Sequence, residues 1–191
     1  MKPIFSIWTK TKKTFQFLEE RDDESNKTMI TVLFFLSAMV VGFPNSHDIH
    51  KIIGGNYYLS LFVSLFVSGL VGVTIYNYIF SYVILGVSRL FKGKASIDRI
   101  RLVFACSLIP NLIILLVGLL MIIPALVLGD KSLVGYNHPI ANYILWIVTL
   151  KIMVVGLKYF NKYSYLFAAL TVVMPVAFVQ GLLYLIRFII K

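Results

Sequence analysis

The sequence predicts an all-α, polytopic membrane protein: a five-transmembrane-helix bundle with an N-terminal amphipathic interfacial helix. Three observations predict this class. Hydrophobic residues make up 59% of the 191-residue chain, and its mean hydropathy is +0.88. Residues 52–88 contain no charged side chain, although about 18 consecutive apolar residues already suffice for a membrane span. We therefore expect one membrane domain over residues 28–191 and no second soluble domain.

Residues 1–27 are predicted to be cytoplasmic and to form an amphipathic helix followed by a linker. Between residues 4 and 20, apolar side chains recur at spacings of three and four, and the lysines fall largely on other faces. This pattern is typical of a helix that lies in the plane of the lipid headgroups. The same apolar face could equally pack on the membrane domain. It includes Ile4, Ile7, Trp8, Phe15 and Leu18.

The first span is predicted over residues 28–43, ending before Pro44, with a loop over residues 45–56. The loop contains three potential zinc ligands, which are His47, Asp48 and His50. A structural zinc site needs four ligands, and no fourth lies nearby in the sequence. The cluster is therefore interpreted as solvated loop residues.

The second span, residues 57–88, decides the topology of the rest of the chain. One long helix leaves most of the 18 basic residues on one side, whereas a hairpin near Gly69 or Gly72 divides them evenly. Lys2 and Lys191 belong to this count. Because basic residues gather on the cytoplasmic side, we predict one long span. The protein is then a multi-pass cell-membrane protein with its N-terminus in the cytoplasm and its C-terminus outside.

Four small residues recur at a strict spacing of four within the second span. On a helix they form one smooth stripe, which lets another helix approach closely. The partner helix could belong to the same protomer, to a second copy or to another membrane protein. The stripe consists of Ser60, Ser64, Ser68 and Gly72.

Three further spans are predicted over residues 102–128, 140–157 and 165–189, with Ser96 as the N-cap before the third span and a kink at Pro110. Across the spans, four polar side chains are candidate intramembrane residues, namely Asn77, Asn111, Lys151 and Gln180. All eight acidic residues lie outside the spans, so we expect Lys151 to have no intramembrane counter-ion. A cation pathway normally needs an acidic residue at depth, which argues against a proton- or sodium-coupled transporter.

No residue set in the sequence predicts an enzyme. The chain lacks a His-Glu-x-x-His helix and a Gly-x-Ser-x-Gly elbow, and its three histidines fall in predicted loops. Its one cysteine, Cys106, lies in an apolar run and is interpreted as a buried thiol. We expect no cofactor and no metal. The net charge is +10. The basic residues behind it flank the spans, so they predict contact with the lipid bilayer and not with nucleic acid.

Several short motifs together resemble a known family. They are Ile7-Trp8, Lys13-Thr14-Phe15, Gly93-Lys94-Ala95-Ser96, Ser107-Leu108-Ile109-Pro110, Trp146, Gly156-Leu157-Lys158 and residues 168–175. With five spans, this pattern is similar to the bacterial branch of the Yip (Ypt/Rab-GTPase-interacting protein) membrane domain family.

The resemblance implies a five-helix membrane domain without catalytic residues. The chain lacks the long N-terminal region of eukaryotic members and its Leu-Tyr-Gly-Pro-type motif, so a GTPase partner is not implied. Some bacterial relatives accompany ABC-type exporters, which implies a non-enzymatic auxiliary or organising subunit acting by helix packing with such partners or with itself. The alternative from the residues is a small-solute transporter or channel lined by the four polar side chains named above.

Overall fold

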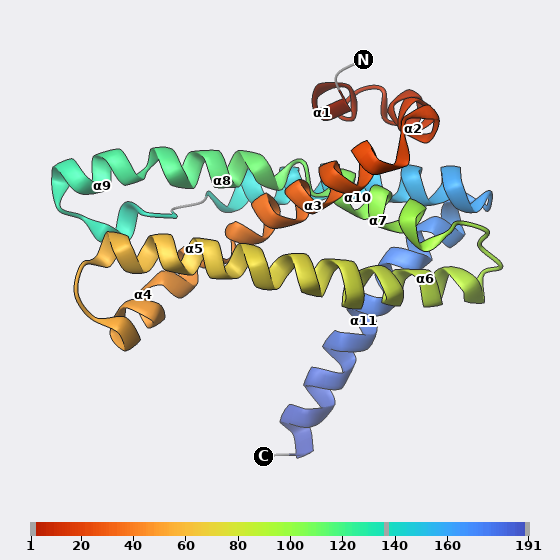
Figure 1. Ribbon diagram of the computed structural model, residues 1–191. Coiled ribbons are helices and arrows are strands. Elements are labelled where there is room, and N and C mark those ends of the chain that lie inside the picture. The colour runs from red at the N-terminus through yellow and green to blue at the C-terminus, as the bar shows by residue number, and fades with distance from the viewer. Residues whose placement is uncertain (1–2, 136–137, 190–191) are drawn as a thin grey trace.

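The computed structural model describes residues 3–135 and 138–189, and every regular element in these ranges is helical (Figure 1). Lys2 and Lys191, which count in the predicted charge asymmetry, lie outside these residues. The elements are α1 (Pro3–Ser6), α2 (Thr11–Glu20), α3 (Asp23–Met39), α4 (Gly42–Ile53), α5 (Tyr57–Thr74), η1 (Ile75–Phe80), α6 (Ser81–Leu90), α7 (Ile97–Ser107), α8 (Asn111–Leu120), α9 (Ile122–Leu128), η2 (Lys131–Leu133), α10 (Pro139–Asn161) and α11 (Tyr165–Ile189).

The uncharged run that organises the sequence forms one continuous helix. Elements α5, η1 and α6 follow each other without a break over Tyr57–Leu90, which is 34 residues. η1 is a π-helical stretch, where the Ser81 hydroxyl donates to the Tyr76 carbonyl at 2.7 Å. At 1.5 Å per residue the helix is about 51 Å long, well beyond a hydrocarbon core of about 30 Å. The predicted single long helix is confirmed, and no hairpin turns at Gly69 or Gly72.

The first predicted span has a different shape from the one expected. Helix α3 ends at Met39, and α4 follows at an angle of 63°. The predicted loop over residues 45–56 is wrong, because α4 continues to Ile53. Pro44 lies in the first turn of α4, where a missing N–H leaves no helical hydrogen bond unmade. The bend lets α4 pack back against α5, since Ser64 Oγ donates to the Gly42 carbonyl at 2.8 Å.

Within residues 3–135 and 138–189, three helical stretches are each long and apolar enough to cross a membrane, and the bent α3–α4 pair could be a fourth. The three are Tyr57–Leu90, Asn111–Leu128 and Pro139–Asn161, and a shorter apolar stretch covers Tyr165–Phe178. The predicted span over 102–128 is broken at Pro110, where α7 gives way to α8. Ser96 caps α7 as predicted, because its hydroxyl accepts from the Arg99 N–H at 3.4 Å.

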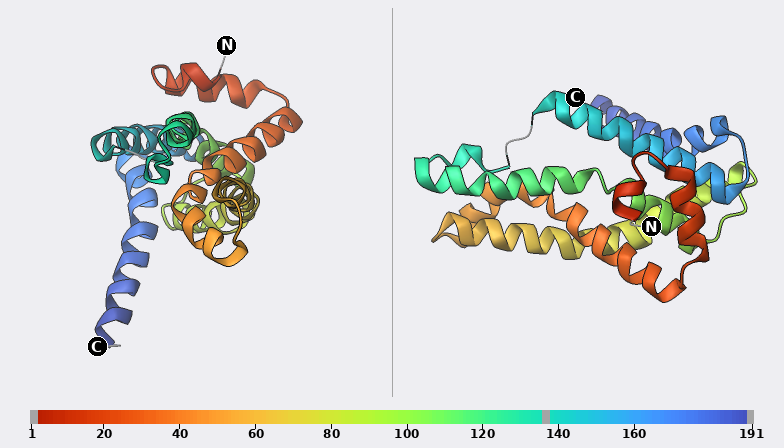
Figure 2. Two further views of the ribbon diagram at one scale, coloured as in Figure 1. Left: turned by 90° about the vertical axis from the view of Figure 1, so that its left-hand side faces the viewer. Right: turned by 90° about the horizontal axis from the view of Figure 1, so that it is seen from above.

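Helix α7 is the centre of the packed bundle. Its residues from Leu102 to Ser107 are all buried, and α3, α6 and α10 pack around it. An aromatic cluster joins α7 to α3 and η1, with Phe104 against Phe34 and Tyr76 at centroid distances of 5.4 Å each. Helix α11, by contrast, runs away from the bundle after its first turns (Figures 1 and 2).

Candidate functional site at the basic end of the bundle

The predicted small-residue stripe is covered by the chain's own helices. Ser60 and Ser64 are buried, Ser68 is half-buried and Gly72 is buried. A Cβ added at Gly72 would stand 2.0 Å from the Cβ of Ala38, so the backbone of α5 packs directly on the Ala38 side chain of α3 there. The stripe therefore packs against α3 and α4 inside one protomer, which is one of the arrangements the sequence allowed.

The four candidate intramembrane polar residues lie on four different elements. Asn77 is half-buried on η1, Asn111 is half-buried at the start of α8, and Gln180 is exposed on α11. Lys151 is exposed on α10, and its Nζ donates to the Trp8 carbonyl at 3.2 Å. None of the three cavities described below is lined by any of them.

The His-Asp-x-His cluster lies on α4 and not in a loop. The His50 ring and the Ser60 hydroxyl are within hydrogen-bond distance at 3.3 Å, and Asp48 pairs with Lys51 at 3.0 Å on the surface. Over residues 3–135 and 138–189, no three histidine, cysteine, aspartate or glutamate side chains gather as metal ligands would.

The N-terminal segment packs across one end of the bundle (Figure 2, right). It is two short helices and not one, because the chain turns between α1 and α2. Its apolar face meets protein, since Ile7, Phe15 and Leu18 are fully buried. The Phe15 ring lies edge-on to Phe160 at 5.8 Å. A Cβ at Gly156 would stand 2.7 Å from the Phe15 ring, so only glycine lets α2 approach α10 so closely there.

Polar contacts hold this segment in register with the bundle. The Tyr159 hydroxyl donates to the Glu19 carboxylate at 2.5 Å, and Asn26 Nδ2 donates to the Leu18 carbonyl at 2.8 Å. Together with the Lys151 contact to Trp8, the Tyr159 contact binds α10 to the N-terminal segment at two positions along the helix. We call this end of the molecule the basic end; it carries Arg89, Lys92, Lys94, Arg99, Arg101, Lys158 and Lys162.

A buried amide organises the turns at the basic end. Asn161 Oδ1 accepts from Ser88 Oγ at 2.7 Å and from the Ala95 N–H at 3.1 Å, which joins α6, the following turn and α10. Its Nδ2 donates to the Leu157 carbonyl at 3.1 Å. Tyr163 continues the network towards Thr171 on α11, with 3.1 Å between their hydroxyl oxygens. Burial raises the pKa of the Tyr163 hydroxyl.

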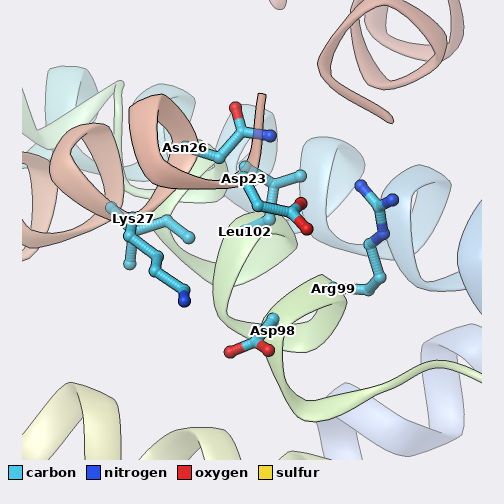
Figure 3. A pocket seen from close by; sticks show the side chains of 7 residues that line it. Asp23, Asn26, Lys27, Asp98, Arg99 and Leu102 are labelled. Atoms are coloured by element: carbon cyan, nitrogen blue, oxygen red, sulfur yellow. The ribbon is translucent and has the colours of Figure 1, made fainter. Parts of the chain in front are cut away.

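Two cavities flank the docked N-terminal segment. The smaller, of about 70 Å³, lies between α3 and α7 and has balanced charge, because Asp23 and Asp98 share it with Lys27 and Arg99 (Figure 3). It has room for ordered water and is far below the size of an organic ligand site. The larger, of about 360 Å³, is lined by Lys12, Gln16, Val155, Lys158, Tyr159 and Tyr165.

A third cavity, of about 280 Å³, lies between α4 and α5. It is lined by Asn45, Asp48, Ile49, Ser64, Val67 and Ser68. Two members of the small-residue stripe therefore border it, and Asp48 is already paired with Lys51. Its lining contains no lysine or arginine, so it is not a second basic site.

Sequence reasoning missed the residues that build the basic end. Asn161 lies in the polar sequence Asn161-Lys162-Tyr163-Ser164 after a predicted span and looks like a solvated loop residue. The one available signal was the turn at Gly93-Lys94-Ala95-Ser96. A Cβ at Gly93 would stand 2.2 Å from Ser88 Oγ and 2.4 Å from Asn161 Oδ1, so this turn needs glycine.

Comparison with known proteins supplies one match. A family model described as the Yip1 domain matches residues 5–187, which is nearly the whole chain. No significant match exists among curated proteins or among solved structures.

Proposed function

The chain belongs to the Yip1 domain family, and on that premise we propose that it is a non-enzymatic auxiliary or organising subunit in the membrane. It acts by packing its helices against other membrane proteins, such as the subunits of an ABC-type exporter. The match supports the class of protein, and the apolar helices support a place in the lipid bilayer.

Helix α11 is the observation that carries this proposal. Its first turns pack on the bundle through Ala168, Thr171 and Val172, which are buried. From Val173 onward, its described side chains are exposed or half-buried, and Phe178 is 73% exposed. Helices in lipid associate through close van der Waals packing, so an apolar helix that leaves its own bundle is suited to pack on a partner.

The proposed topology has five spans, a cytoplasmic N-terminus and a C-terminus outside the cell. The bent α3–α4 pair, Tyr57–Leu90, Asn111–Leu128, Pro139–Asn161 and α11 would supply the spans. Residues 1–27 would then be the cytoplasmic segment and residues 28–191 the membrane domain. The charge distribution supports this orientation, because the basic end would face the cytoplasm.

The alternative of a small-solute transporter or channel needs one cavity lined by Asn77, Asn111, Lys151 and Gln180. Their positions on η1, α8, α10 and α11 give that reading no support. Lys151 is instead bonded to the N-terminal segment of the same chain.

The test is a pulldown in mild detergent of the tagged protein at native expression, with quantitative mass spectrometry of the recovered membrane proteins. We expect a defined set of partners that is lost when Val176 and Phe178 are changed to alanine. The matched control changes Ile144 and Ile147, which are exposed on α10, to alanine and should keep the partners. Recovery of the protein alone, or equal loss in both variants, would contradict the proposal.

A further inference from the structure

We propose that the cavity between α2, α10 and α11 binds the phosphate of an anionic phospholipid headgroup. This site goes beyond the proposed packing function and does not depend on it. The cavity measures about 360 Å³, within the range of small-ligand pockets.

Unpaired positive charge distinguishes this cavity from the other one at the basic end. Its two charged lining residues, Lys12 and Lys158, are both cations. Within the described part of the chain, ion pairs join Lys51 to Asp48 and Arg101 to Asp98, and neither cavity lysine belongs to them. The smaller cavity holds two acids beside its two bases. An anion is therefore favoured only in the larger cavity.

The polar side chains around these lysines are arranged for an acceptor-rich ligand. Lys158 Nζ stands 3.6 Å from the centroid of the Tyr165 ring, a cation–π contact that holds the ammonium at the cavity wall. Gln16 adds an amide that can donate. The nearby Glu19 carboxylate already accepts from the Tyr159 hydroxyl. A phosphate would thus meet two ammonium groups and an amide.

The surface below the cavity favours a lipid over free phosphate. Ile144, Ile147, Lys151, Val155 and Lys158 follow each other on α10 at spacings of three and four, so they lie on one face. Ile144 and Ile147 are 57% and 61% exposed. A headgroup at Lys158 would therefore have exposed apolar side chains farther along the same face, beyond Lys151, for its acyl chains. Basic pockets between helices at the cytoplasmic side of a membrane are suited to anionic headgroups.

The test is native mass spectrometry of the full chain in detergent with dioctanoyl phosphatidylglycerol, and with dioctanoyl phosphatidylcholine for comparison. We expect tighter binding of the anionic lipid and a weakening on the order of 10-fold or more in the double variant K12Q/K158Q. The matched control is K13Q/K162Q, which removes the same charge from α2 and from the end of α10 outside the cavity. It should bind like the unaltered protein.

Three results would overturn the proposal. They are equal binding of the two lipids, equal weakening in both double variants, and complete displacement of the lipid by inorganic phosphate at matched concentration. The last would identify free phosphate as the ligand. If K12Q/K158Q does not fold, the comparison of Lys12→Gln with Lys13→Gln remains, because both side chains are exposed on α2. Equal affinity of those two variants would then refute the site.

Discussion

The substitution Asn161→Ala tests whether one buried amide holds the basic end together. Asn161 is 2% exposed, and its Oδ1 accepts a hydrogen bond from the N–H of Ala95, which is 3% exposed. Removing the amide leaves this buried N–H without its acceptor, which costs about 1–3 kcal/mol, and it removes the bond from Ser88 as well, worth about 0.5–1.5 kcal/mol. We therefore expect the free energy of unfolding to fall by about 1.5–4.5 kcal/mol.

The chain carries its own reporter for this measurement. Cys106 is its one cysteine and is fully buried, so a thiol-reactive dye labels it only when the bundle opens. Denaturation in mixed detergent micelles, followed by this labelling, gives the free energy of unfolding. Ser88→Ala removes a single donor of the same network and should cost about 0.5–1.5 kcal/mol. If Asn161→Ala costs no more than Ser88→Ala, the amide does not organise these turns.

The other predictions concern packing and topology. Gly72→Leu should destabilise the protein by about 1–3 kcal/mol or more, since α3 leaves no room for a side chain. Gly86→Leu should be tolerated, because nothing lies within 4 Å of an added Cβ there; equal stability in the same Cys106 assay would disprove close α3–α5 contact. Phe15→Ala should cost about 3–5 kcal/mol, whereas exposed Phe5→Ala should change stability by less than about 0.5 kcal/mol. Similar values for both would mean that the N-terminal segment is not docked. In a Cys106→Ala background, Leu70→Cys should stay unlabelled by a water-soluble thiol reagent in membranes; rapid labelling would contradict a continuous span.

The parts of the fold that sequence could predict rest on local rules. Residues 57–88 form one helix, as the uneven distribution of basic residues on the two sides of this uncharged run indicates. Ser96 caps α7 and Pro110 ends it through properties of the residues themselves.

The parts that sequence missed depend on contacts between distant residues. Residues 45–53 are polar enough to resemble a loop, and they are helical because α4 packs on α5. From the sequence, the apolar face near Phe15 is equally compatible with lipid and with protein. It packs on protein because Gly156, 141 positions later, leaves room for the Phe15 ring against α10. Asn161 carries no signal of burial, because its partners Ser88 and Ala95 lie 73 and 66 positions away.

Lys151 illustrates how a long-range contact changes the physical argument about one residue. In the sequence it is an isolated cation inside an apolar run, with no acidic residue in any predicted span to neutralise it. In the structure its ammonium donates to the Trp8 carbonyl, so a main-chain dipole supplies the partner that a carboxylate would otherwise supply. Lys151 lies seven residues before Lys158, about 10 Å along α10. The N-terminal segment therefore reaches at least that far along the bundle. Lys151, which has no acidic partner in any predicted span, instead holds the N-terminal segment on the basic end of the bundle.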